Sequence, residues 1–307
     1  RRQRQMCIRD RDKEVLNQNI ETILVTSDGN IWVGTRSTVL CYNPDLTLKK
    51  KYNNELPSTN INSIYEAPDG TLWVALWRNG IYRYNPKDDT FKHYPQIGSG
   101  NNPFRIYQDN RKQYWVCTWG NGLYLFNPDK EGDQMYIRQE VFNKERQLAE
   151  DTFFSIVQDD KYGYVWVMSI SGLHAFEYDK DGKLKNIDIS YLFKESNNIY
   201  SEIIKDRTGN LWIATFSEGV LTINFDRPVI KNYSISSIKE RTGITPNITA
   251  ISGDGDGDIW VNQNRWGLGI FNPEKNSIRL YSDYPQLKNL PILSNVCLLY
   301  TSDAADE

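Results

Sequence analysis

The stretch DGTLWVALWRNGIYRYNP, residues 69–86, contains the pattern that decides the fold. An Asp-Gly pair precedes a short apolar run around Trp73, Gly80 follows, and an alternating run leads to Asn85-Pro86. Alternation with a period of two, bounded by turn residues, predicts two short β-strands joined by tight turns. The Asp-Gly pairs at 28–29 and 69–70 are typical of a two-residue hairpin turn.

The same pattern occurs six times along the chain, and in each copy a tryptophan stands within the apolar run. Consecutive copies of this residue are 41 to 51 residues apart, which is the length of one propeller blade or a similar stacked unit. The six positions are Trp32, Trp73, Trp115, Trp166, Trp212 and Trp260.

Each repeat reads as four short strands, and the second repeat is the clearest. It predicts strands over residues 61–66, 72–76, 81–84 and 91–94, separated by turn residues. Helical periodicity is not convincing anywhere over ten residues or more. The sequence therefore predicts an all-β fold, a β-propeller of four-stranded antiparallel blades. Because a blade cannot bury both faces alone, the repeated tryptophans are expected to lie between neighbouring blades.

The two ends of the chain differ from the repeats. Residues 1–11 and 297–307 resemble translated sequencing adapter, read from opposite strands of one DNA, and are not expected to belong to the folded domain. Residues 12–296 are therefore predicted to form the propeller. Within them, residues 290–296 repeat the lead-in of the second unit at residues 56–61, so we expect six blades and the start of a seventh.

The net charge gives no support for a nucleic-acid partner, and the cysteine spacing gives none for a metal site. The formal net charge of −3 gives no electrostatic reason to expect nucleic acid. Cys41 and Cys117, the cysteines within residues 12–296, lack metal-ligand spacing and are expected to be buried free thiols. No run of 18 apolar residues and no signal peptide is visible, and no metal or cofactor is predicted.

Catalytic and metal-binding motifs find little support. The two histidines, His93 and His174, stand near no nucleophile motif and are interpreted as ordinary strand residues. No catalytic residue is therefore predicted. The alternating Asp and Gly of residues 253–258 could supply oxygen ligands to calcium. That segment lacks the terminal acid of an EF-hand loop and falls where a hairpin turn is expected, so turn chemistry is the simpler interpretation.

A second set of aromatic residues falls in the turn between the second and third strands, which would gather them on one face of the disc. Aromatic rings there could cover the apolar face of a sugar while polar neighbours bond its hydroxyls. The alternative is that these rings pack against the next blade or only rim the disc. Asn264 lies in the same turns, and the candidate ligand-binding residues are Trp77, Arg78, Asn79, Trp119, Asn121, Phe216, Arg265 and Trp266.

Residues 69–86 and residues 209–226, GNLWIATFSEGVLTINFD, resemble the two-component regulator propeller repeat. The resemblance extends over nearly all of residues 12–296, although the third repeat has Arg111-Lys112-Gln113 where Asp-Gly is usual. It implies the periplasmic, ligand-sensing region of a membrane-anchored hybrid histidine kinase. The partners implied are an oligosaccharide, a second propeller and downstream signalling domains of the same parent, with dimerisation through that parent.

Two other functions compete with this non-enzymatic sensor. A propeller glycosidase of the sialidase type would carry an S-x-D-x-G-x-T-W box, whereas Asp and Gly are adjacent here. A protein-interaction scaffold of the WD type would need a Trp-Asp pair closing a strand, and the chain has none.

Overall fold

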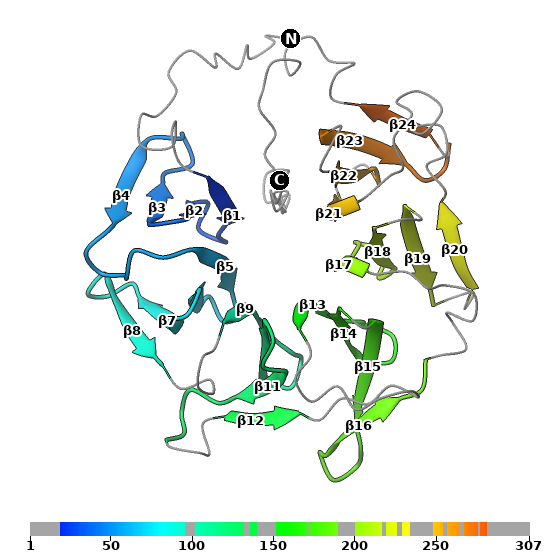
Figure 1. Ribbon diagram of the computed structural model, residues 1–307, viewed down its shortest axis with the longest axis horizontal. Helices are drawn as coiled ribbons and strands as arrows, with labels where there is room; N and C mark the ends of the chain where they lie inside the picture. The colour runs from blue at the N-terminus through cyan, green and yellow to red at the C-terminus, as the bar shows by residue number, and fades with distance from the viewer. Residues whose placement is uncertain are drawn as a thin grey trace.

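The computed structural model describes residues 19–95, 102–131, 136–139, 152–170, 172–189, 200–216, 219–225, 229–233, 248–253, 257–263, 267–275 and 277–280. Every regular element in these residues is a β-strand, and the strands form six antiparallel sheets of four strands each. Each sheet consists of four strands that are consecutive in sequence, so each sheet is one blade (Figure 1). The predicted all-β propeller is confirmed.

The first three blades span the N-terminal half. Blade 1 consists of β1 (Ile20–Val25), β2 (Ile31–Thr35), β3 (Val39–Tyr42) and β4 (Leu48–Tyr52). Blade 2 consists of β5 (Ile61–Glu66), β6 (Leu72–Leu76), β7 (Gly80–Asn85) and β8 (Thr90–Tyr94), each within one residue of the strand predicted at either end. Blade 3 consists of β9 (Pro103–Gln108), β10 (Tyr114–Thr118), β11 (Leu123–Phe126) and β12 (Tyr136–Gln139).

The other three blades follow in the same order. Blade 4 consists of β13 (Phe153–Gln158), β14 (Val165–Ser169), β15 (Gly172–Tyr178) and β16 (Leu184–Ile187). Blade 5 consists of β17 (Tyr200–Lys205), β18 (Leu211–Thr215), β19 (Val220–Asn224) and β20 (Val229–Tyr233). Blade 6 consists of β21 (Ile248–Gly253), β22 (Ile259–Gln263), β23 (Gly267–Asn272) and β24 (Ser277–Leu280).

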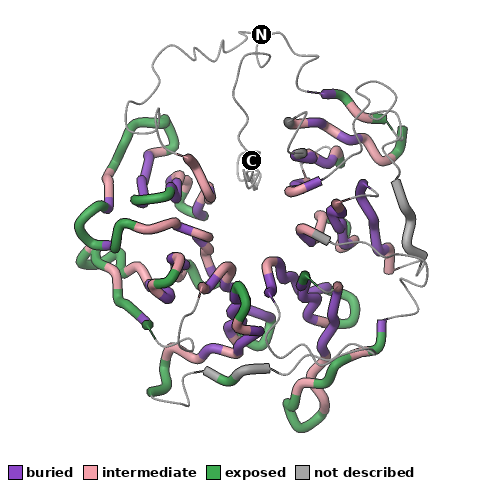
Figure 2. The backbone as a smooth tube through the Cα atoms, viewed as in Figure 1, coloured by how far each residue is buried: buried purple, intermediate pink, exposed green. Residues whose placement is uncertain are grey.

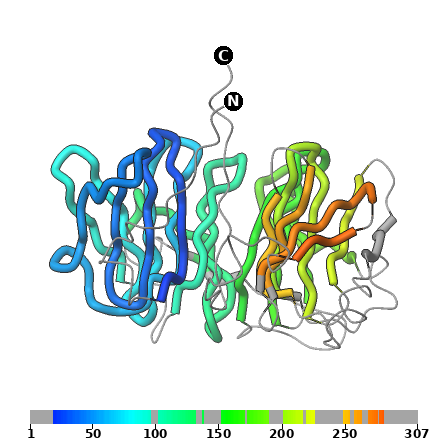
Figure 3. The backbone as a smooth tube through the Cα atoms, turned by 90° about the horizontal axis from the view of Figure 1, so that it is seen from above, coloured from blue at the N-terminus to red at the C-terminus, as the bar shows by residue number. Residues whose placement is uncertain are grey.

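The blades stand side by side around a centre, with the first strand of each blade innermost (Figure 1). Each innermost strand contacts that of the next blade, from β1 through β21. Among the described strands, none of blade 6 packs to a comparable extent against blade 1, and Figure 1 shows the two blades apart. The strands run between the two faces of the disc (Figure 3). Among the described turns, those between the first and second strands and between the third and fourth strands therefore lie on one face, and the 2–3 turns lie on the opposite face.

Apolar layers between adjacent blades form the core, and buried residues concentrate on the second and third strands (Figure 2). Strand β6 shows how one strand serves two layers. Leu72, Val74 and Leu76 pack against blade 1, whereas Trp73 and Ala75 pack against blade 3. This follows from the alternation of side chains along a strand, because a strand between two blades needs apolar residues on both faces.

Five of the six repeated tryptophans are buried between blades, as predicted, and the sixth is an exception. Trp32, Trp73, Trp115, Trp166 and Trp212 are buried. Trp260 is only half-buried. Its neighbours Ile259 and Val261 pack against blade 5, so Trp260 projects from the opposite face of blade 6, where no described blade follows.

The Asp-Gly turns differ from the two-residue hairpin that was predicted. The turn between β1 and β2 spans residues 26–30, with Gly29 N donating to Thr26 O at 2.8 Å and Thr26 N donating to Asn30 O at 2.9 Å. Of the Asp28-Gly29 pair only Gly29 has a positive φ, 82°, so the type I′ geometry with two such residues does not form. In the equivalent turn of blade 3, Lys112 occupies the position of Gly29 and also has a positive φ, 63°.

In blades 3, 4 and 5 an aspartate opens this turn and accepts the hydrogen bond of the buried indole. The Nε1–Oδ2 distance is 2.8 Å for Trp115 and Asp109, 2.9 Å for Trp166 and Asp159, and 2.6 Å for Trp212 and Asp206. The same carboxylates accept backbone N–H groups of their turns. The aspartate therefore fixes the turn and satisfies a donor that burial would otherwise leave unpaired.

Polar side chains also connect the innermost strands. Arg105 of blade 3 reaches past blade 4 to Glu202 of blade 5, with an Nη2–Oε1 distance of 3.3 Å. The other oxygen of Glu202 accepts the backbone N–H of Ile251 in blade 6 at 2.9 Å. Ser155 of blade 4 bonds the backbone of Ile203 in blade 5. The almost fully buried carboxylate of Glu202 thus links blades 3, 5 and 6 near the axis, and Ser155 joins blade 4 to blade 5.

Cys41 and Cys117 are buried free thiols, as predicted. Burial raises the pKa of Cys41 to about 11 and that of Cys117 to about 12. No segment of the described chain forms a helix long and apolar enough to cross a membrane. The adapter-like segments 1–11 and 297–307, and residues 290–296 predicted to begin a seventh blade, lie outside the described residues.

Candidate functional site

In blades 1 to 5 the residue that directly follows the second strand occupies the same place, on the face formed by the 2–3 turns. In four consecutive blades, 2 to 5, this residue is large and apolar. We name the set the apolar arc, and its members are Trp77, Trp119, Ile170 and Phe216. Blade 1 has Arg36 at this position. The arc therefore covers one part of the face rather than all of it.

Trp77 and Trp119 form the best-defined part of the arc. The backbone N–H of each residue donates to the residue before the first strand of its own blade, Asn60 O and Asn102 O, at 2.9 Å in both cases. These bonds fix both turns on adjacent blades. The two indole rings meet edge to face with centroids 6.2 Å apart, and Phe104 lies 5.9 Å from Trp119 on its other side.

Exposure distinguishes the members of the arc. Trp119 is 46% exposed and Ile170 is 52% exposed. Trp77 and Phe216 are half-buried. The rings of Trp77 and Trp119 thus contact each other across two blades, while that of Trp119 remains open to solvent. Ile170 was not among the predicted residues, although its place directly after the second strand could have identified it.

The polar residues predicted beside these rings have different roles. Arg78 is exposed and adopts a left-handed conformation with φ 61°. Asn79 belongs to the turn itself: its N–H donates to Leu76 O at 3.2 Å and its side chain to Trp77 O at 3.4 Å. Asn121 is half-buried in the turn of blade 3. Of these three side chains, that of Arg78 extends furthest into solvent.

Two predicted residues, Arg265 and Trp266, lie outside the described residues, as does Asn264. Residues 254–256 of the possible calcium loop are also outside them. Asp258, at the end of that loop, bonds Asn272 and pairs with Arg279 at 3.2 Å. Within the described ranges, no group of three His, Cys, Asp or Glu side chains could hold a metal ion.

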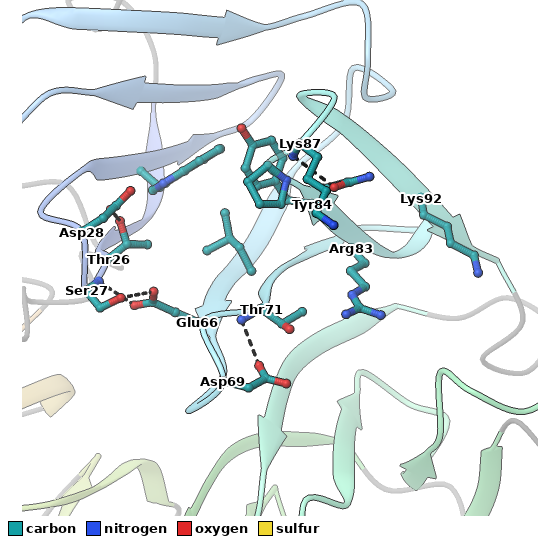
Figure 4. A pocket seen from close by; sticks show the side chains of 15 residues that line it. Thr26, Ser27, Asp28, Glu66, Asp69, Thr71, Arg83, Tyr84, Lys87 and Lys92 are labelled. Atoms are coloured by element: carbon teal, nitrogen blue, oxygen red, sulfur yellow. Dashed lines mark hydrogen bonds between the residues drawn. The ribbon is translucent and has the colours of Figure 1, made fainter.

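A pocket of about 670 Å³ opens on the opposite face, between the turns of blades 1 and 2 (Figure 4). Side chains of both charges line it above a partly apolar floor. The acidic residues are Asp28, Glu66 and Asp69, the basic residues are Arg83, Lys87 and Lys92, and the apolar or aromatic ones include Trp32, Leu72, Tyr84 and Pro86. The repeat pattern could not predict this pocket, because its residues come from two blades that meet only in the folded chain.

A contact between a serine and a histidine bears on the enzymatic alternative. Ser169 Oγ lies 2.9 Å from His174 Nε2. Ser169 is fully buried, and its hydroxyl also donates to Gly172 O across the 2–3 turn at 3.2 Å. Thr118 and Thr215 bond the corresponding glycine carbonyl in blades 3 and 5. The hydroxyl is therefore a turn-bonding group that recurs between blades and is not accessible to a substrate.

The fold resembles solved propellers of several functions. The extracellular domain described as a hybrid two component system from B. thetaiotaomicron superposes with a TM-score of 0.67 at 20% identity, over 86% of this chain and 36% of that one. Virginiamycin B lyase from Staphylococcus aureus gives a TM-score of 0.68 at 16% identity, over 86% and 84%. PorZ, a surface component of the type-IX secretion system of Porphyromonas gingivalis, gives 0.61 at 17% identity, over 81% and 38%.

A family model also matches part of the sequence. Three segments, residues 14–37, 55–78 and 194–217, match the two component regulator propeller. Each match ends just after the second strand of blade 1, 2 or 5. These three segments are thus similar to two component regulator propeller repeats, and the fold is like that of an extracellular domain of a hybrid two-component system. This chain spans about a third of the length of the B. thetaiotaomicron domain. No curated protein matches the chain in sequence.

Proposed function

We propose that this propeller is a periplasmic ligand-sensing domain of a hybrid two-component regulator, and that it binds an oligosaccharide on the apolar arc. The observation that carries the proposal is the Trp77–Trp119 pair, in which one ring supports the other while Trp119 remains 46% exposed. A sugar ring can stack its C–H face on such an indole. The family match supports the sensing role.

The signal would leave the domain through the rest of the parent protein. A second propeller and a histidine kinase of the same parent are the partners this role requires, with dimerisation through that parent. Occupation of the arc would couple blades 2 and 3, because Trp77 and Trp119 come from adjacent blades. Binding that favours one arrangement of these blades over another is the physical condition for a signal.

The experiment is calorimetric titration of the full 307-residue chain with neutral gluco-, manno- and arabino-oligosaccharides. We expect at least one series to bind, and Trp119→Ala to weaken that binding by about tenfold, which is about 1.4 kcal/mol. Because half of this ring is already exposed, the melting temperature should change little.

The matched control is Tyr162→Ala. Tyr162 is an aromatic residue that is 55% exposed in the 1–2 turn of blade 4, on the opposite face. Its removal should leave the affinity unchanged. Binding by no member of the panel, or equal losses in both variants, would reject the arc as a sugar site and favour it as the contact surface for a second propeller.

A further inference from the structure

The pocket between blades 1 and 2 contains basic side chains that the fold leaves without an ionic partner. Arg83, Lys87 and Lys92 line it and form no ion pair with any described carboxylate. Arg83 of β7 and Lys92 of β8 are direct cross-strand partners at the edge of the pocket, and both project from the face of blade 2 that packs against blade 3. Arg83 lies over the ring of Trp73, 5.9 Å from its centroid, and Lys92 lies over that of Tyr94, at 5.0 Å. Like charges placed directly opposite each other repel and destabilise a sheet. The repulsion would be relieved by an anionic group bound between them.

The acidic side chains of the pocket, by contrast, are held by the turns. Glu66 accepts hydrogen bonds from the backbone N–H and the hydroxyl of Ser27 at 2.8 and 2.7 Å. Asp28 accepts the hydroxyl proton of Thr26 at 2.6 Å. The Glu66–Ser27 bonds join the end of β5 in blade 2 to the 1–2 turn of blade 1, and they fix the side of the pocket opposite Arg83 and Lys92 (Figure 4).

Asp69 stands between the two sides and restricts the kind of anion that fits. Its Oδ1 accepts the backbone N–H of Thr71 at 2.9 Å. Burial opposes ionisation of Asp69, but hydrogen bonds from Thr71 and the charge of Arg83 outweigh it and lower the pKa of this carboxyl. A bare anion at Arg83 would meet this negative charge. A ligand that carries hydroxyl donors beside its anionic group would bond Asp69 and Arg83 at once.

We propose that the pocket binds a sugar acid, with the ligand carboxylate at Arg83 and Lys92 and its hydroxyl groups at Asp69. The volume of about 670 Å³ is in the range of small-molecule sites. Pro86, in the 3–4 turn of blade 2, provides apolar surface at the edge of the pocket for the body of the sugar. This site lies on the opposite face from the apolar arc and does not depend on the arc as a sugar site.

The test compares two probes on the full chain by calorimetry: trigalacturonate, which carries carboxylates, and galactotriose, its neutral counterpart. Trigalacturonate should bind and galactotriose should not, and the affinity should fall as salt is raised. Arg83→Gln and Lys92→Gln should each weaken the binding of trigalacturonate by about tenfold. Arg83→Lys should restore part of the affinity because it keeps the charge.

Two control variants establish whether the binding is specific to this pocket. Lys130→Gln removes an exposed lysine from the 3–4 turn of blade 3, which corresponds to the turn of Lys87, and should have no effect. Trp119→Ala should also have no effect, since it tests the arc alone. Absence of trigalacturonate binding, equal affinity for galactotriose, or unchanged affinity in Arg83→Gln and Lys92→Gln would overturn the proposal.

Discussion

The bond between Asp109 and Trp115 allows a sharp test of how neighbouring blades are held together. Asp109 is 3% exposed and accepts four hydrogen bonds. The donors are Trp115 Nε1 at 2.8 Å, Tyr178 OH at 2.6 Å, and the backbone N–H groups of Arg111 and Gln113, both at 2.9 Å. Tyr178 belongs to blade 4, so one carboxylate of blade 3 connects two blades. Arg111 lies over the Tyr178 ring, 4.4 Å from its centroid.

The substitution Asp109→Ala leaves these donors without their acceptor, at a cost that differs between them. The indole N–H of Trp115 is fully buried, and leaving it unpaired should cost about 1–3 kcal/mol by itself. The half-buried Tyr178 hydroxyl and the two turn amides regain some bonds to water and add less. We therefore expect a total loss of about 3–5 kcal/mol in the free energy of unfolding, typical of a broken buried network.

Urea denaturation followed by tryptophan fluorescence measures this loss. Asp45→Ala is the control, because Asp45 also holds a turn, accepting the N–H of Thr47 at 2.9 Å, but is exposed. Its loss should cost no more than about 1 kcal/mol, since water replaces the bond. Equal costs for Asp109→Ala and Asp45→Ala would refute the reasoning that burial and the link between blades make Asp109 important.

Two further predictions concern the blade interfaces. Trp73→Ala should cost about 3–5 kcal/mol because this ring is fully buried, whereas Trp260→Ala should cost clearly less because its ring is half-buried; equal shifts in urea midpoint would contradict this. Burial opposes ionisation of Asp89. Hydrogen bonds from Lys50, Tyr52 and Tyr84 outweigh this effect and lower the pKa of Asp89 below the usual 3.8. Its stabilising effect is therefore complete above that value and is lost as the pH falls through the folded-state pKa, so thermal melts of Asp89→Asn between about pH 5 and pH 3 should show a smaller decline than those of the unaltered chain.

The candidate sites differ in how far the sequence could predict them. Trp77, Trp119 and Phe216 were identified because turn positions recur with the blade period. Ile170 occupies the equivalent position in blade 4, but an aliphatic side chain has no ring face and so lies outside the aromatic pattern. The pocket between blades 1 and 2 gave no signal, since Arg83 and Glu66 are unremarkable residues of their own strands until a neighbouring blade brings Ser27 against them.

The strands, the blades and most of the residues between blades could be predicted from the sequence. These depend on local physics: side chains alternate along a strand, and Gly or Asp permits the turn that follows. Contacts between residues far apart in the chain, such as that of Arg105 with Glu202, became visible only in the tertiary structure. The same is true of the side-chain exposure of Trp119 and Trp260. The reason is geometric, because the packing of one blade on the next sets which polar groups meet near the axis and whether a repeated ring is covered. A repeat pattern does not specify how one blade packs on the next.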